Sequence, residues 1–433
     1  MVTKNRYILI NLLTTLFMLI NHSTIHAKHE HEPLARYWEV PVEKVPDLLT
    51  IEENLIMVDS ILKPILDNLN FGGTYINAKE NKVFINTVNS SMIPIVKSTP
   101  EIKPYIDLLS FLNATKSSYQ LNTTFNELII LAQELNAYNV EIGINPKFNN
   151  IVIDLNHEDD EVNKNFIDSA AKFNPIMQYS EADPTDSTIL ESNIEKRNGL
   201  IFPNLLCGDG LHDRNGKSIC SVGLNVRDSN GQDYIMTAGH CGTRSPRNQQ
   251  GFVDLYQKGW FSPPTYRYVG QLEYYSSNQT YDFGLIRVIG TNVSLSTIIS
   301  NLDQIPNIYA LLFIKDISVI TSVGASVCKS GHKTHVTCGE VLELNFATAI
   351  RNINTNQTVI KREMIKTNLK GGPGDSGGIV YTYSTNQSVF VLVVGTMVGG
   401  SKTRSYFLPL PVSFRVSRID YNLNLSVVVT RQL

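Results

Sequence analysis

The sequence has little cysteine, little net charge and few long apolar runs. Five cysteines in 433 residues are too few for a small disulfide-dense scaffold, and the first of them is residue 207. The 37 lysines and arginines and the 40 aspartates and glutamates give a formal net charge of −3. Because a dedicated nucleic-acid binder normally has a basic excess, no nucleic-acid partner is expected. With 42% apolar and 18% charged residues, the chain is typical of globular proteins, and its length predicts about two or three domains.

The one long apolar run is too short to cross a membrane. It extends from Ile8 to Ile20, follows Lys4 and Arg6, and is followed by a polar stretch that ends at Ala27. A membrane-spanning helix needs roughly 20 apolar residues. The pattern is typical of a secretory signal peptide over residues 1–27, with a membrane anchor as the alternative. We therefore expect the mature chain to be extracellular and free of membrane spans, in a compartment where disulfides persist.

Residues 28–197 contain no cysteine and predict an α+β region. Apolar residues at helical spacing predict one helix within residues 48–69, which a proline interrupts, and a second helical region over 108–135. Segments 76–85 and 144–153 are similar to each other, and each predicts a β-hairpin with a polar turn. The pattern indicates a helix-plus-hairpin unit that is used twice.

A boundary is predicted at Lys196-Arg197. A polar segment precedes this dibasic pair, and the composition changes after it. An exposed basic pair between two compact regions is a site at which a processing protease cuts. The pattern leaves open whether another protease or the chain itself makes the cut. Residues 198–433 are dense in short Val, Ile, Thr and Tyr runs between turns, which is typical of an all-β barrel or sandwich.

Three motifs in this second region contain groups capable of catalysis. They are Thr237-Ala-Gly-His-Cys241, Tyr281-Asp-Phe-Gly-Leu-Ile-Arg287 and Gly371-Gly-Pro-Gly-Asp-Ser-Gly-Gly378. They place His240, Asp282 and Ser376 in the order that the chymotrypsin architecture uses, which differs from the orders of subtilisin and the α/β-hydrolases.

The three residues predict nucleophilic catalysis. A serine hydroxyl becomes a good nucleophile when a neighbouring base takes its proton, so Ser376 requires His240. Asp282 is expected to orient the imidazole and to stabilise its charged form. The oxyanion of a tetrahedral intermediate needs donors, which the backbone N–H groups of Gly374 and Ser376 are expected to supply.

The second region resembles the chymotrypsin-like serine proteases of the α-lytic protease and streptogrisin branch. The likeness covers most of residues 206–433 and is carried by 220–226, 237–242, 327–339 and 367–378. The first region resembles the long pro-region of that branch at Phe71-Gly-Gly-Thr-Tyr-Ile-Asn77.

The resemblance implies an all-β catalytic domain of two six-stranded antiparallel barrels, preceded by an α+β pro-domain. It implies a secreted, monomeric serine endopeptidase made as a proenzyme, which acts on proteins or peptides. The chain's own pro-region is the implied partner, as folding catalyst and inhibitor. No cofactor and no metal are implied.

The resemblance also implies covalent and ionic links. Two disulfides are expected, Cys220–Cys241 and Cys328–Cys338. Lys329 matches an internal basic residue of the branch and is expected to pair with Asp375. Cys207 is left over, either as a buried thiol or as a partner in an intermolecular disulfide.

Two positions depart from the family pattern. Lys370 stands where the branch commonly has a cysteine, so the disulfide that braces the substrate pocket is expected to be absent. Val398 stands where the family usually has a serine that helps to satisfy the catalytic aspartate, so activity could be reduced. These departures motivate an alternative, in which the chain is a catalytically silent homologue that acts as a binding protein.

Substrate contacts are also implied. Gly399 and Gly400 match the positions that pair with an extended substrate as an added strand. The S1 pocket, which holds the substrate side chain before the cut bond, is expected near Asn368 and Leu369, with Met397 and Gly400 on another wall. Because no acid stands at its base, an apolar P1 residue is favoured. Lys370 or Lys402 would instead favour an acidic one.

The sequence also contains N-glycosylation sequons. After the predicted signal peptide they are at Asn89, Asn113, Asn122, Asn278, Asn292, Asn356, Asn386 and Asn424. In a eukaryotic host these would permit a glycoprotein. In a chain so rich in asparagine, several arise by composition alone.

Overall fold

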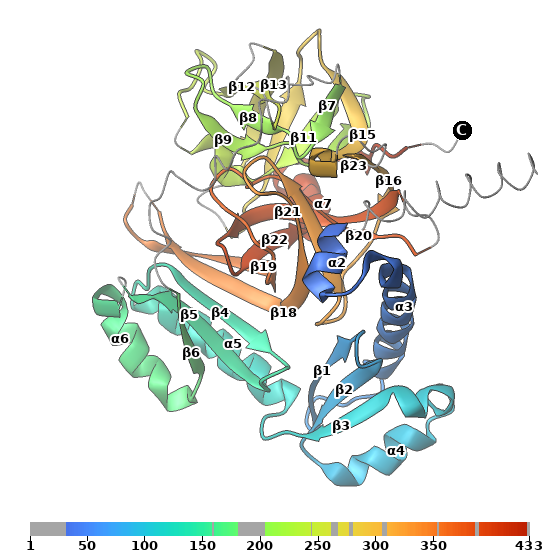
Figure 1. The fold of residues 1–433 in the computed structure, drawn as a ribbon. Helices are drawn as coiled ribbons and strands as arrows, with labels where there is room; N and C mark the ends of the chain where they lie inside the picture. Colours follow the sequence, from blue (N-terminus) through green and yellow to red (C-terminus); the bar gives the residue numbers. More distant parts are fainter. Residues whose placement is uncertain are drawn as a thin grey trace, which may run out of the picture.

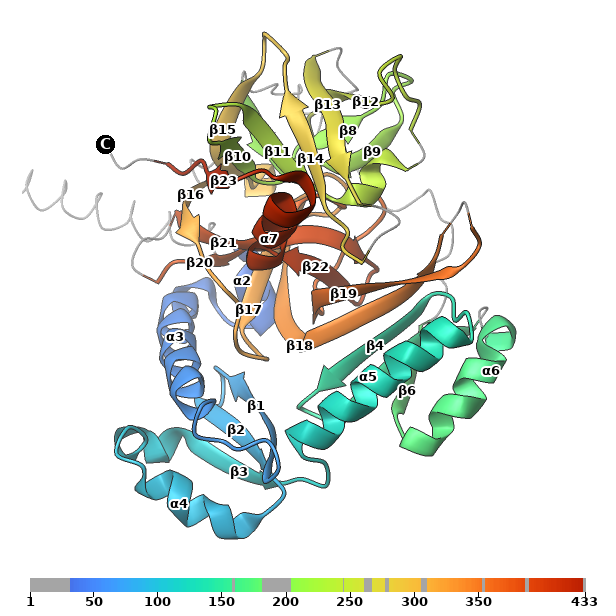
Figure 2. The same cartoon turned by 180° about the vertical axis from the view of Figure 1, so that it is seen from behind.

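The structure is a computed structural model of the chain. It describes residues 32–157, 160–180, 204–243, 245–260, 267–276, 280–304, 310–352, 355–385 and 389–430. The predicted signal peptide and the Lys196-Arg197 pair lie outside these residues. The α+β region lies against one side of the all-β region (Figures 1 and 2). No helix among the described residues is both long enough and apolar enough to cross a membrane.

The N-terminal region contains two units of similar design. The first consists of α2 (Glu32–Trp38), η1 (Val42–Lys44), α3 (Val45–Leu62), β1 (Phe71–Asn77), β2 (Lys82–Thr87), η2 (Ser90–Met92), α4 (Ile93–Ser98), η3 (Lys103–Leu108) and β3 (Leu109–Asn113). The second consists of α5 (Ser118–Glu134), β4 (Val140–Asn145), β5 (Asn150–Asn156), α6 (Asp160–Ala170), η5 (Ala171–Phe173) and β6 (Ile176–Ser180). In each unit an antiparallel hairpin follows a helix, and a third strand then pairs in parallel with the second. Both hairpins expected from the sequence are therefore present.

The prediction of a helical region over residues 108–135 was wrong for its first residues. Residues 109–113, expected to be helical, form strand β3 beside β2. The helix α5 begins only after Ser117, whose hydroxyl accepts the N–H of Gln120 at 3.2 Å while the Gln120 side chain accepts the N–H of Ser117 at 2.9 Å. This reciprocal cap is a strong helix start, and it leaves the alternating Leu109 and Phe111 to face the core of the first unit.

The C-terminal region is built from two sheets. The first has eight short strands in the order β23-β10-β11-β14-β13-β12-β8-β9. Their bounds are β8 (Gly210–His212), β9 (Ser218–Ser221), β10 (Asn225–Asp228), β11 (Asp233–Thr237), β12 (Val253–Lys258), β13 (Tyr268–Tyr275), β14 (Gly284–Val288) and β23 (Leu425–Val427). The short helix η6 (Gly239–Gly242) follows β11.

The second sheet contains the rest of the C-terminal strands. They are β7 (Asn204–Cys207), β15 (Ser294–Ser300), β16 (Leu311–Ile317), β17 (Ser326–Gly331), β18 (His335–Arg351), β19 (Thr358–Thr367), β20 (Ile379–Tyr383), β21 (Phe390–Gly400) and β22 (Ser405–Pro409). The short helix η7 (Leu302–Gln304) lies between β15 and β16, and α7 (Leu410–Tyr421) follows β22. Helix α7 lies where the two sheets meet (Figure 2).

The second sheet continues into the N-terminal region. Strand β4 pairs antiparallel with β18, so that β6, β5 and β4 extend the sheet to twelve strands (Figure 1). Gly143 leaves room for the Glu343 side chain beside this pairing, because a Cβ there would lie 1.7 Å from a carboxylate oxygen of Glu343. Ala347 and Ala349 of β18 pack into the core of the second N-terminal unit. The two regions therefore share both backbone hydrogen bonds and apolar contacts.

The first N-terminal unit contacts the start of β17 and the loop before it. The carboxylate of Glu52, in α3, accepts the N–H of Ser326 at 2.7 Å and its hydroxyl at 2.6 Å. Asp59 of the same helix accepts the hydroxyl of Ser322 at 2.5 Å. Helix α2 buries Leu34 and Trp38 in the core of the β region. Each N-terminal unit is thus docked by its own set of buried contacts.

Candidate active site

Two of the sequence-predicted residues are brought together by loops of the first sheet. His240 lies in η6, after β11, and Asp282 lies in the loop that leads into β14. The Nδ1 atom of His240 is 3.0 Å from one carboxylate oxygen of Asp282, and the backbone N–H of His240 donates to the other at 2.9 Å. The His240 side chain is 40% exposed while that of Asp282 is 6% exposed. The imidazole can therefore reach a substrate while the carboxylate stays covered.

A glycine permits this approach of the two loops. A Cβ at Gly239 would lie 2.5 Å from the carbonyl oxygen of Phe283, so only glycine allows the two backbones to pack this closely. Phe283 is held in turn by Ser276, whose N–H donates to the Phe283 carbonyl at 2.9 Å and whose hydroxyl accepts the Phe283 N–H at 3.2 Å.

The pair is tuned electrostatically. Burial raises the pKa of Asp282, but the nearby His240 and the more distant Lys361 outweigh it and hold that pKa below its usual value. Burial lowers the pKa of His240, but Asp282 outweighs it, so this pKa lies above the ordinary 6.5. Asp282 is therefore ionised at neutral pH, and His240 is a stronger base than a free histidine.

Ser376 lies in a turn that packs against the approach to His240. A Cβ at Gly377 (φ +83°) would lie 2.0 Å from the hydroxyl of Thr237, the last residue of β11. The carbonyl of Ser376 accepts the N–H of Ser221 at 2.7 Å. The Ser376 hydroxyl donates to the carbonyl of Val398 at 3.3 Å, and no hydrogen bond to His240 is present among the described contacts. Such bonds often tighten only when substrate binds.

The same turn presents two backbone donors. The N–H groups of Asp375, Gly377 and Gly378 donate to carbonyls at 2.8–3.0 Å. Within the described hydrogen bonds, the N–H groups of Gly374 and Ser376 donate to nothing. Gly374 has φ +112°, a conformation that favours glycine. Two unpaired N–H groups in one turn, beside a serine hydroxyl, can bind an oxyanion.

A buried ion pair holds the turn in place. Lys329 and Asp375 are 3.2 Å apart, and their side chains are 0% and 1% exposed. Lys329 also donates to the carbonyl of His335 at 2.8 Å, and Asp375 accepts the N–H groups of Lys333 and Thr334 at 2.8 and 3.0 Å. Burial raises the pKa of Asp375, but Lys329 and these hydrogen bonds hold it below its usual value. The residue before Ser376 is therefore fixed as an anion.

The cysteines brace the same area. Disulfides join Cys220 to Cys241, beside His240, and Cys328 to Cys338, across β17 and β18. Cys207 is a buried free thiol, which corresponds to the first of the two alternatives considered for it. Burial raises its pKa to about 12, so it is an inert packing residue.

The residues expected to line the substrate pocket separate into two groups. A Cβ at Gly371 would lie 2.7 Å from the hydroxyl of Ser405, 3.6 Å from Met397 and 3.7 Å from Gly400, so these four residues gather at one place. The hydroxyl of Ser405 donates to the carbonyl of Leu369 at 2.8 Å, while the Leu369 side chain packs into the core.

Asn368 lies outside this group. Its side-chain oxygen accepts the N–H of Glu340, in β18, at 2.6 Å, which directs it toward the N-terminal region. Gly399 packs against the Tyr406 hydroxyl, because a Cβ there would lie 2.6 Å from it. Sequence reasoning missed Ser405 and Gly371. For Gly371, the available sequence signal was the double glycine that begins the Ser376 motif.

Comparison with known proteins agrees with this geometry. Residues 209–409 match the trypsin family profile, "Trypsin". This chain contains a serine protease domain of the trypsin family. It is 29% identical to serine protease 2 of Streptomyces fradiae over 188 residues, which are 43% of this chain and 89% of that protein. It is 28% identical to streptogrisin-C of Streptomyces griseus over 210 residues, which are 47% of this chain but only 38% of that protein. The predicted family, enzyme class and fold class are confirmed, so the protease is a serine-type endopeptidase of the streptogrisin branch.

Solved structures give similar matches. Nocardiopsis protease is 20% identical and has a TM-score of 0.38, over 52% of this chain and 100% of that one. Thermobifida fusca protease A is 20% identical and has a TM-score of 0.36, over the same shares.

Replacing Lys329 by Met is expected to destabilise the protease strongly. The substitution keeps the apolar stem but leaves the Asp375 carboxylate buried without its cation, at a cost of about 3–5 kcal/mol. Urea unfolding of the Ser376→Ala protein, with and without Lys329→Met, measures this cost. Lys370→Met removes an exposed lysine from the same protein and is the control, with an expected change within about 0.5 kcal/mol. Equal stability of the two lysine variants would contradict the assignment.

Proposed function

We propose that this protease is a secreted proenzyme in which Ser376, His240 and Asp282 hydrolyse peptide bonds through an acyl-enzyme. The observation that carries the proposal is the short contact between the exposed His240 ring and the covered Asp282 carboxylate, beside the Ser376 turn with its two unpaired N–H groups. Proteins or peptides are the substrates of the family.

The geometry supports a stepwise mechanism. Since Asp282 binds Nδ1 of His240, the Nε2 atom is left to take the proton of the Ser376 hydroxyl as its oxygen attacks the peptide carbonyl. The N–H groups of Gly374 and Ser376 stabilise the oxyanion. His240 then donates the proton to the leaving amine, and the same residues activate a water molecule that releases the acyl group.

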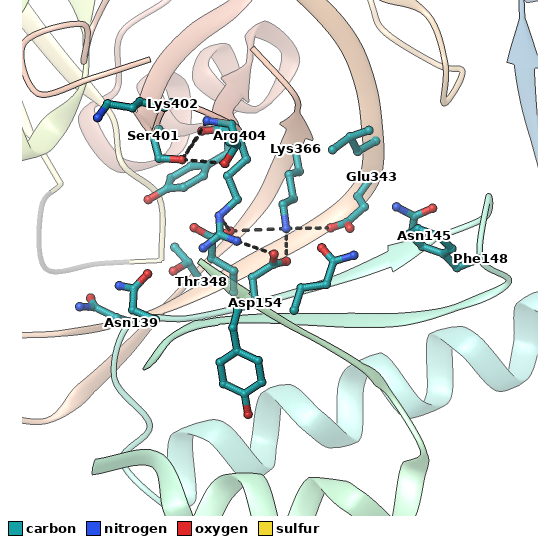
Figure 3. A pocket seen from close by; sticks show the side chains of 18 of the residues that line it. Asn139, Asn145, Phe148, Asp154, Glu343, Thr348, Lys366, Ser401, Lys402 and Arg404 are labelled. Atoms are coloured by element: carbon teal, nitrogen blue, oxygen red, sulfur yellow. Dashed lines mark hydrogen bonds and ion pairs between the residues drawn. The ribbon is translucent and has the colours of Figure 1, made fainter. Parts of the chain in front are cut away.

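We further propose that residues 28–197 act as the pro-region, the folding partner and inhibitor of the protease. A charged cluster supports their docking (Figure 3). Lys366 of β19 forms an ion pair with Asp154 and lies 3.4 Å from Glu141, while Arg404 lies 2.5 Å from Asp154 and 3.3 Å from Glu141. Burial, with the charges of Asp154 and Glu141, raises the pKa of the adjacent Glu343 to about 7 against the lowering effect of Lys366. A buried lysine and a half-buried arginine of the protease are thus matched by two carboxylates of the N-terminal region.

The position of this cluster supports inhibition. It borders a cleft of about 1100 Å³ whose walls come from both regions (Figure 3). Tyr179 of β6 lines one side, and the other is lined by Gly400, the last residue of the proposed substrate strand, and by Ser401. A docked N-terminal region therefore crowds the path of an extended substrate.

We propose an apolar P1 preference. The residues that gather around Gly371 are Met397, Gly400 and Ser405, and none of them carries a charge. An uncharged pocket discriminates against a basic or acidic side chain, because such a chain would lose its hydration without gaining a partner.

Replacing Ser376 by Ala is expected to abolish casein cleavage and labelling by an organophosphate serine reagent. The full chain is expressed in a secretory host, and the N-terminus of the product is sequenced. A product of the wild type that begins after Arg197 and takes up the label supports the proenzyme proposal. Correct processing without labelling would instead support the catalytically silent alternative.

The acid limb of kcat/KM is expected to lie above pH 6.5. His240 acts as a base only when neutral, so activity falls as pH drops through its pKa, which Asp282 raises. Asp282→Asn is expected to lower this midpoint and to reduce the rate by about 10⁴-fold. A pH series with a peptide substrate measures both. A midpoint that is unchanged in Asp282→Asn would contradict the pairing.

Asp154→Asn is expected to weaken retention of the pro-region. The change removes the charge of one of the two carboxylates that Lys366 and Arg404 share, and leaves them only Glu141 in the N-terminal region. Co-purification of the cleaved N-terminal fragment with a C-terminally tagged protease is expected to fall by about tenfold or more. Asp168→Asn, in an exposed pair on α6, is the matched control. Equal retention of the two variants would remove the role of the cluster.

A further inference from the structure

Lys361 is a buried cation that the mechanism above does not use. It lies in β19, and the residue is 1% exposed. Its ammonium donates to the carbonyls of Ser276 at 3.0 Å and Tyr281 at 3.1 Å. Tyr281 directly precedes Asp282, so these contacts place the charge beside the loop that carries the proposed catalytic carboxylate. Among the described contacts, Lys361 has no direct salt bridge to Asp282.

A bulge in β19 directs the lysine to this loop. Phe346 of β18 pairs with Met364 of β19, and Thr348 pairs with Lys361. Between these two pairs β18 covers two residues and β19 covers three, so β19 contains one extra residue. The extra residue accommodates Glu363, whose φ of +57° is rare for a side chain of this kind. Bulges of this kind re-aim side chains and are frequent beside active sites.

Neighbours of Lys361 hold the same loop. The N–H of Arg362 donates to the carbonyl of Thr280 at 3.1 Å, and the carboxylate of Glu363 accepts the Tyr281 hydroxyl at 2.7 Å. Arg415 of α7 binds Glu363 at 2.7 Å from the other side. Three consecutive residues of the second sheet therefore fasten the loop of the first sheet that carries Asp282.

Asp282 needs such a cation. Both described hydrogen bonds to its carboxylate come from His240, and the side chain of Val398, where the resemblance leads one to expect a serine, has no donor. A buried carboxylate with few donors is costly unless another positive charge lies near it.

We propose that Lys361 is a positioning residue that keeps Asp282 ionised and limits the basicity of His240. The proposal rests on the proposed function of the His240–Asp282 pair. The titratable groups that face Asp282 are His240 on η6, Lys361 on β19 and the Tyr406 hydroxyl on β22. Lys361 works against the raising effect of Asp282 on the pKa of His240, and it lowers the pKa of Asp282. Burial in turn lowers the pKa of Lys361 itself, which Asp282 counteracts.

The test is a histidine titration followed by NMR in the full chain with Ser376→Ala, which requires no catalytic activity. Lys361→Gln retains donors toward the two carbonyls but removes the charge, Lys361→Met removes both, and Lys361→Arg retains both. The His240 midpoint is expected to rise by about 0.5–1 pH unit in the Gln and Met variants and to stay near the parent value in the Arg variant. Lys370→Met is the surface control. An unchanged His240 midpoint in Lys361→Gln would leave Lys361 only the role of holding the loop and would overturn the proposal. If Lys361→Met does not fold, Lys361→Gln still provides the test.

A kinetic measurement separates this proposal from the proposed function. With Ser376 intact, the acid limb of kcat/KM is expected to shift upward in Lys361→Gln, with a loss of up to about tenfold at pH 7, because each unit of pKa changes the ratio of charged to neutral imidazole tenfold. A parent enzyme with no activity would count against the proposed function, while a shifted His240 titration would still support the role of Lys361. A parent enzyme that is active, with a Gln variant of the same acid limb, would count against Lys361 alone.

Discussion

The site depends on keeping one carboxylate, that of Asp282, charged in an enclosed place. Two hydrogen bonds from His240 meet its oxygens, and the buried ammonium of Lys361 lies behind its loop. The donors come from the first sheet and the cation from the second, so the site exists only when both sheets are packed together. A buried charge is stable only while its partners stay in place, which makes the geometry of the pair rigid.

The turn that carries Ser376 depends on a buried and neutralised carboxylate in the same way. Asp375, directly before Ser376, is buried and neutralised by Lys329, and backbone N–H groups satisfy its remaining oxygen positions. The cation comes from the side chain of an internal residue of the chain. The N-terminal region also docks through paired opposite charges, since Lys366 and Arg404 lie against Asp154 and Glu141. The protease is therefore organised around three enclosed groups of opposite charges.

Local sequence was sufficient to predict the elements that short-range chemistry defines. The three motifs identified the positions of His240, Asp282 and Ser376, and the polar turns identified both hairpins of the N-terminal region. The strand at residues 109–113 was missed, because its pairing with β2 is a tertiary contact that helical spacing does not reveal. Asn368 turns toward Glu340 for a similar reason, since its partner lies on another strand. The position of Lys361 beside the Asp282 loop could not be predicted from the sequence, because a bulge in β19 brings it to a loop some eighty positions earlier in the chain.

The most direct test of the account is to trap the acyl-enzyme. The processed protease is mixed with an activated ester of an apolar acyl group and quenched in acid, where a protonated His240 no longer activates water for deacylation. The modified residue is then mapped by mass spectrometry. The account predicts one acyl group per chain, on Ser376, and none after Ser376→Ala. An acyl group on another residue, or peptide cleavage that persists in Ser376→Ala, would contradict it.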